Sequence, residues 1–180
     1  MTSKPAHALG ALARLYFDIA IWRRGPADVP GVPSVLWLTV AAYAVVTALL
    51  SLALRLPGSW PRELALDIVY MLAWVWLLLR AAGRRERVLQ TAAAVFGFQL
   101  VLAPLMIGVS AVVPGSGAAG GLQLLPWIAT LLVIAWVVLA TAHILRAALE
   151  WPLAACVPCA LFLFLAEQLL LQALFHPATR

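Results

Sequence analysis

The chain has 180 residues, of which 65% are hydrophobic and 11% are charged, and its mean hydropathy is +1.02. A soluble domain carries roughly 45–50% apolar and about 25% charged residues, and a chain this short cannot bury so much apolar surface in its own core. A soluble globular protein is therefore excluded, and so is disorder. The net charge of +5 does not indicate nucleic-acid binding, because the basic residues cluster at the ends of apolar runs, where membrane topology explains them.

Residues 1–33 form the first predicted unit, a cytoplasmic N-terminal segment with a helix over residues 8–22. Apolar side chains recur at helical spacing along one side of this helix, and charged side chains lie on the other. We expect an amphipathic helix that lies in the membrane interface. The sequence RRGP at residues 23–26 ends it, because proline and glycine interrupt helices.

Residues 34–175 form the second predicted unit, a bundle of five transmembrane helices. About 20 mostly apolar residues cross the hydrocarbon of a bilayer, and five stretches meet that length at residues 34–54, 64–82, 91–113, 122–145 and 151–175. A glycine-rich loop is expected at 114–121, a tight turn before span five, and a short outer-side tail at 176–180. The predicted fold class is an all-α integral membrane protein with five transmembrane helices plus an N-terminal amphipathic interfacial helix.

The distribution of lysine and arginine predicts the orientation of the bundle. With the N-terminus in the cytoplasm, nine basic residues lie on the cytoplasmic side: Lys4, Arg14, Arg23, Arg24, Arg80, Arg84, Arg85, Arg87 and Arg146. The opposite side then holds three: Arg55, Arg62 and Arg180. The excess predicts a cytoplasmic N-terminus and a C-terminus on the outer side.

Two segments carry a resemblance to known membrane proteins. Residues 83–97, GRRERVLQTAAAVFG, form a basic, glycine-containing turn that leads into a helix of small residues, and this resembles the Yip-type (Ypt-interacting protein) five-span family. Residues 18–30, DIAIWRRGPADVP, are similar to small inner-membrane proteins of proteobacteria. The resemblance implies a role in membrane organisation or trafficking and a place in a bacterial inner (plasma) membrane, and it brings no catalytic residues.

Glu167 is the most informative single residue, because a carboxylate deep inside an apolar span is costly. Helical spacing puts small and apolar residues on its face, which predicts that Glu167 points into the bundle. Asp67 enters the second span at a similar depth, and Arg55 and Arg62 are candidate counter-charges. The functional interpretation is a proton or cation site; the structural one is an ion pair or a neutral, hydrogen-bonded acid.

Other polar groups have ordinary structural explanations. Gln99, like Gln168 and Gln172, is expected to hydrogen-bond between helices. His143, Arg146 and Glu150 share one face at the end of span four, where an Arg146–Glu150 pair is expected. Three arginines between spans two and three are candidate contacts for anionic lipid headgroups: Arg84, Arg85 and Arg87.

Cys156 and Cys159 form a Cys-x-x-Cys pair with an intervening proline, a pattern used in thiol redox chemistry. The predicted cytoplasmic side disfavours a persistent disulfide, and two small residues on a packed helix are the simpler interpretation. Two cysteines with no histidine nearby also make a zinc site improbable.

The sequence therefore favours a non-enzymatic accessory or organising protein that packs against partner membrane proteins, further copies of itself or lipids. The first alternative is a small transporter or proton- or cation-conducting bundle that uses Glu167 and Asp67. The second is a membrane thiol redox protein that uses Cys156 and Cys159. We expect no catalytic residues, no metal and no other cofactor, and the predicted partners are the lipid bilayer and membrane proteins, with no nucleic acid.

Overall fold

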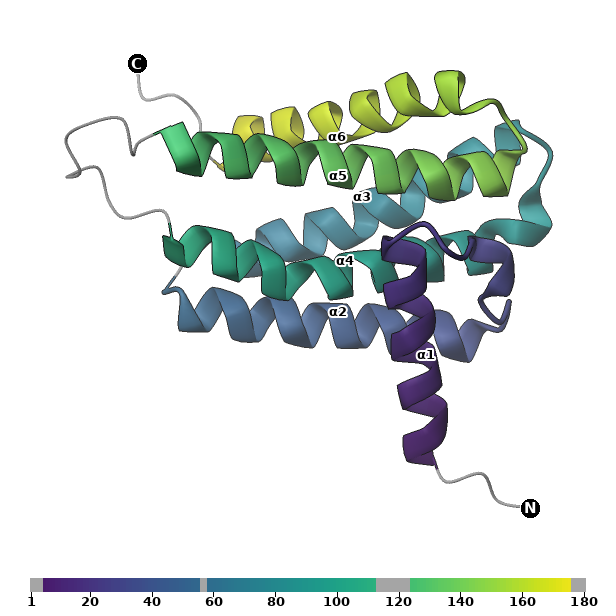
Figure 1. The fold of residues 1–180 in the computed structure, drawn as a ribbon, viewed down its shortest axis with the longest axis horizontal. Helices are drawn as coiled ribbons and strands as arrows, with labels where there is room; N and C mark the ends of the chain where they lie inside the picture. The colour runs from purple at the N-terminus through teal and green to yellow at the C-terminus, as the bar shows by residue number, and fades with distance from the viewer. Residues whose placement is uncertain (1–4, 56–57, 113–123, 176–180) are drawn as a thin grey trace.

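The computed structural model describes residues 5–55, 58–112 and 124–175, and these are helical with short connections. Six α-helices and two short 3-10 helices follow one another along the chain (Figure 1). Their bounds are α1 Pro5–Ala20, η1 Pro26–Asp28, α2 Pro33–Ala53, α3 Trp60–Ala81, η2 Arg85–Arg87, α4 Val88–Val112, α5 Leu124–Leu149 and α6 Leu153–Phe175. The predicted all-α fold class is thus confirmed for the described residues.

Helices α2 to α6 run alternately up and down a single bundle (Figure 1). All five are long and apolar enough to cross a membrane, because a span needs about 20 mostly apolar residues. The chain is therefore a multi-pass membrane protein. The predicted loop at 114–121 and tail at 176–180 lie outside the described residues.

Two of the predicted span boundaries were wrong by about one helical turn. Helix α3 begins at Trp60 instead of residue 64, because Pro61 fits the first turn of a helix, where no backbone N–H is needed. Helix α5 continues to Leu149 instead of residue 145, with Arg146 in its last turn, where a basic side chain is favoured by the helix dipole. The three-residue turn before α6 confirms the predicted tight connection.

The two ends of the bundle differ in charge, and we name them by that difference. The arginine end holds η1, η2 and the α5–α6 turn, with Arg84, Arg85 and Arg87. The opposite end holds the α2–α3 connection. Helix α4 lies at the centre and contacts α1, α2, α3 and α5. Its residues 91–98 are all buried, and the small side chains among them allow its neighbours to approach closely.

Helix α1 runs across the bundle near the arginine end, and its first half projects beyond the other helices (Figure 1). Its buried side chains, Leu15, Tyr16 and Ile19, recur at helical spacing and face α4. Two hydrogen bonds fix it to the spans: the Tyr16 and Thr39 hydroxyls lie 2.6 Å apart, and Trp136 Nε1 donates to the Ala20 carbonyl at 3.0 Å. Because Tyr16 and Ala20 lie in the second half of α1, that half is the anchored one.

Candidate functional site: a carboxyl pair inside the bundle

Asp67 on α3 and Glu167 on α6 meet inside the bundle. Asp67 is buried, with 9% of its surface exposed, and the Glu167 carboxyl lies close enough to interact with it. An ionised carboxylate only accepts hydrogen bonds, so a bond between two carboxyl groups requires a proton on one of them. The arrangement is therefore suited to a pair that shares one proton.

Two tyrosines hold the carboxyl pair in place. The Tyr43 hydroxyl on α2 donates to Asp67 Oδ2 at 2.6 Å, a short distance typical of bonds to carboxylates. The Tyr70 hydroxyl on α3 donates to the Leu163 carbonyl at 2.8 Å, one turn before Glu167 on α6. These bonds connect α2, α3 and α6 around the pair.

The expected counter-charges do not reach the pair. Arg55 and Arg62 have exposed side chains, and neither forms an ion pair with a carboxylate of the described chain. Arg55 follows the end of α2 in a left-handed conformation with φ of 52°, and Arg62 lies in the first turn of α3. Both are thus at the end of the bundle, and the expectation of a structural ion pair with arginine was wrong.

A cavity of about 30 Å³ adjoins the carboxyl pair between α3, α4, α5 and α6. Its polar lining comes from Tyr70, Gln99, Thr141 and Glu167. Ala160 and Leu163 line it as well, so they share the inward face of α6 with Glu167. Gln99 was expected to bond to a neighbouring helix, but its amide has no protein hydrogen-bond partner among the described residues. Its side chain contributes to the cavity wall instead.

Hydroxyl groups line one face of α2, and the sequence analysis missed them. Thr39, Tyr43, Thr47 and Ser51 recur every fourth residue, a spacing that places side chains on one helix face. The Tyr43 and Thr47 hydroxyls are hydrogen-bonded, and Ser51 Oγ donates to the Thr47 carbonyl at 2.8 Å. The signal was present in the sequence as four hydroxyl residues at a constant spacing within one apolar span.

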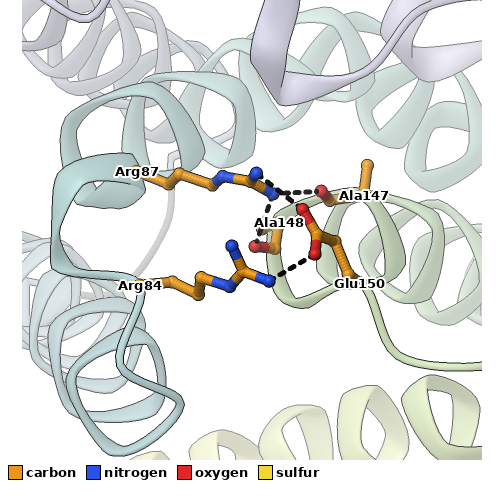
Figure 2. Close-up of polar contacts among 5 residues, drawn as sticks. All are labelled: Arg84, Arg87, Ala147, Ala148 and Glu150. Carbon is orange, nitrogen blue, oxygen red and sulfur yellow. Dashed lines mark hydrogen bonds and ion pairs between the residues drawn. The ribbon is translucent and has the colours of Figure 1, made fainter.

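A second polar cluster closes the arginine end (Figure 2). Arg87 Nη2 donates to Glu150 Oε1 at 2.7 Å, and its Nη1 lies 3.2 Å from the carbonyls of Ala147 and Ala148. Arg84 pairs with the second oxygen of Glu150. The hydrogen bond from Arg87 and the charge of Arg84 lower the pKa of the Glu150 carboxyl below its ordinary value. This cluster links the start of α4 to the last turn of α5.

The predicted Arg146–Glu150 pair was therefore wrong. Helix α5 ends at Leu149, and Glu150 adopts a left-handed conformation with φ of 60°, so its side chain leaves the helix face that carries Arg146. Of the three candidate headgroup contacts, Arg84 and Arg87 are bound to Glu150, while Arg85 is exposed.

The two cysteines are free thiols near the start of α6. Cys156 is buried and its Sγ lies 4.0 Å from the Trp151 carbonyl, while Cys159 is partly buried. Within the described ranges, no group of three or more histidine, cysteine or acidic side chains lies close enough to hold a metal ion.

Comparison of the chain with protein-family models, with curated proteins and with solved structures gives no match.

Proposed function

We propose that the protein binds and releases protons at the Asp67–Glu167 pair, as a small proton-conducting or proton-coupled membrane bundle. The observation that carries this proposal is the placement of two carboxyl groups inside the bundle, with Asp67 bound by Tyr43 and Glu167 in the wall of a cavity. At 1.5 Å per residue, Asp67 lies about 10 Å from the start of α3 and Glu167 about 12 Å from the end of α6. The pair is therefore well inside the apolar part of the bundle.

A purely structural role explains this pair less well than proton exchange does. An ionisable group inside a membrane is expensive, and two carboxyl groups that share a proton repel each other once it leaves. An amide at either position would supply hydrogen bonds without that cost. What a carboxyl group adds is the capacity to lose the proton, so the pair is suited to reversible protonation.

The excess of basic residues supports a cytoplasmic arginine end, with the N-terminus inside and the C-terminus outside. The position of α1 near that end, across the bundle, supports an interfacial location for this helix. Phe17 and Trp22, which are 54% and 48% exposed, then face lipid or headgroups, as aromatic residues do at membrane interfaces. A bacterial inner membrane and membership of the Yip-type family rest on the resemblance of two short segments and stay predictions.

The proposal is tested by proton flux into liposomes that contain the purified protein and an internal pH indicator. With a potassium ionophore to balance charge, we expect flux above that of protein-free liposomes. Glu167→Gln and Asp67→Asn should each lower it at least tenfold, because neither amide can ionise. Glu63→Gln, which removes an acid from the first turn of α3, is the matched control and should keep the wild-type flux.

Flux that is absent, or that survives both substitutions, would contradict proton exchange. The protein would then act by packing, as the accessory or organising role predicts, and its partners should be sought by purification from native membranes under mild conditions.

A further inference from the structure

The polar surroundings of the carboxyl pair differ toward the two ends of the bundle. On α3 the cavity is lined by Tyr70, Met71 and Trp74, which follow Asp67 in the direction of the arginine end. On α6 it is lined from Ala160 to Glu167, again toward that end. The cavity thus extends from the carboxyl pair toward the arginine end, whereas Thr47 and Ser51 follow Tyr43 toward the opposite end of α2.

The cavity has the size and the lining of a water site. A volume of about 30 Å³ exceeds the roughly 10–15 Å³ that one water molecule requires. Gln99 and Thr141 line it and lack protein hydrogen-bond partners in the part of the chain that the structure describes. Buried polar groups without protein partners are usually satisfied by ordered water, so these side chains offer the two to four bonds that a buried water needs.

A fully buried hydroxyl lies further along the same face of α4. Thr91 is 0% exposed, and its Oγ1 has no hydrogen-bond partner. It stands one turn from Val95, which lines the cavity, and one turn from Arg87 at the arginine end. Thr91, Val95 and Gln99 follow one another every fourth residue, so they share one face of α4, and Arg87 precedes that helix in η2.

We propose that the cavity holds water and gives Glu167 access to solvent at the arginine end, with Gln99 and Thr141 as the groups that bind this water and the unpartnered Thr91 hydroxyl as the next polar group toward that end. Glu167 is the exchanging acid, since it lines the cavity. Asp67 does not line it and is held by Tyr43, so Asp67 is a positioning residue. The inference rests on the proposed function for its biological purpose, but its test does not.

The proton balance of one exchange involves the pair and the water alone. The O–H bond of Glu167 breaks and a cavity water gains the proton; the Glu167 carboxylate later takes up a proton again from a cavity water, which restores the O–H bond. The titratable groups that face Glu167 are Asp67 and Tyr70 on α3 and Tyr43 on α2. Helices α4 and α5 contribute the uncharged Gln99 and Thr141.

Cysteine accessibility tests the water and its side of entry without any flux measurement. The background is the chain with Cys156→Ala and Cys159→Ala, which has no other cysteine. Gln99→Cys places a thiol in the cavity wall, and Leu100→Cys is the matched control at the same depth, outside the cavity lining. Arg85→Cys and Gly58→Cys are exposed references for the arginine end and the opposite end.

Silver ions are added to right-side-out or inverted membrane vesicles, and the thiols left unblocked are labelled after denaturation. We expect silver to block Gln99→Cys at least ten times faster than Leu100→Cys, and only in the vesicles in which Arg85→Cys is blocked. Two results would overturn the inference. One is an equal blocking rate for Gln99→Cys and Leu100→Cys; the other is blocking of Gln99→Cys only in the vesicles in which Gly58→Cys is blocked.

A cavity-filling substitution provides the second measurement. Ala160→Val adds two methyl groups to a buried residue of the cavity wall and should slow the blocking of Gln99→Cys at least fivefold. Ala173→Val makes the same change at an exposed position of α6 and should leave the rate unchanged. If silver blocks Gln99→Cys but no proton flux depends on Glu167, only the proposed function is contradicted. If the flux depends on Glu167 but silver does not reach Gln99→Cys, only the water route is contradicted.

Discussion

The ring of Tyr16 lies directly on the backbone of Gly97, so a Cβ atom added at this glycine would overlap the ring. This contact is where α1 crosses the central helix α4. Since Gly97 lies within a helix, it is required here for close approach and not for an unusual backbone conformation. The hydroxyl of Tyr16 reaches past α4 to Thr39 on α2, so one side chain connects three helices.

Gly97→Ala should therefore destabilise the protein by about 1–3 kcal/mol, the usual range for overpacking a well-packed contact, and release the anchored half of α1. Thermal unfolding in detergent and protease cleavage within α1 would both report this change. Gly10→Ala is the matched control, because Gly10 lies in α1 and has nothing within 4 Å of an added Cβ. It should be neutral or slightly stabilising, since alanine favours helix.

The Glu150 cluster predicts a stability that depends on pH in the acidic range. Arg87 and Arg84 lower the pKa of Glu150 below 4.5 in the folded protein. The Glu150 carboxylate therefore contributes its full share to folding stability above pH about 4.5. This stabilisation is lost as the pH falls through the lower pKa of the folded state. The unfolding temperature, measured at pH 7, 5 and 3.5, should fall at acidic pH, and it should fall less in Glu150→Gln. Glu86→Gln, which changes an exposed acid of η2, should show the same fall in unfolding temperature as the wild type.

Tyr43→Phe should weaken the bundle more than Tyr70→Phe. The first removes a donor from a carboxyl group, a bond worth about 1.5–3 kcal/mol, whereas the second removes a donor from a backbone carbonyl, worth about 0.5–1.5 kcal/mol. Both substitutions delete one hydroxyl from a ring that otherwise keeps its packing, so each is the control for the other. Unfolding midpoints in the same detergent would compare them, and equal losses would argue against a special role for the Asp67 bond.

Replacing Cys156 and Cys159 together by alanine should leave the function unchanged. Both thiols are free, and Cys156 donates to a backbone carbonyl, an ordinary packing arrangement. The measurement is the proton flux of the double variant, with expression level and unfolding temperature as controls for folding. Loss of flux in a normally folded double variant would revive the thiol redox alternative.

The proposed orientation of the chain predicts that reporters fused to its two ends lie on opposite sides of the membrane. A reporter that is active only in the cytoplasm should work at the N-terminus, and one that is active only outside should work at the C-terminus, because five spans separate the ends. A C-terminal reporter active only in the cytoplasm would contradict this orientation or the number of spans.

The spans could be predicted from the sequence because each is a long, mostly apolar run with polar or helix-breaking residues near its ends. The contact between Asp67 and Glu167 could not, since it depends on how α3 and α6 rotate about their axes, and apolar spans of nearly uniform hydrophobicity carry little information about that rotation. The arginine partners expected for Asp67 were wrong for the same reason: proximity in sequence does not determine which helix face a side chain occupies.

The partner of Glu150 illustrates a second limit of the sequence. The spacing of Arg146 and Glu150 indicates a pair only if the helix includes both residues, and α5 ends one residue too early. A one-residue change in a helix end is within the ordinary uncertainty of helix boundaries. This one-residue difference nevertheless changes the partner of the Glu150 carboxylate: it binds two arginines that lie more than 60 residues earlier in the chain instead of an arginine of its own helix.

The hydrogen bond between Trp136 and the Ala20 carbonyl spans 116 residues, and this separation has a consequence for biosynthesis. The ribosome makes α1 before the spans, but the partners of α1 on α4 and α5 belong to the third and fourth spans that follow it. Until those spans are made, α1 has no complete docking surface. Helix α1 can thus reach its final position only after most of the spans that follow it have been made, and a chain truncated before α5 would leave α1 without the indole that holds its end.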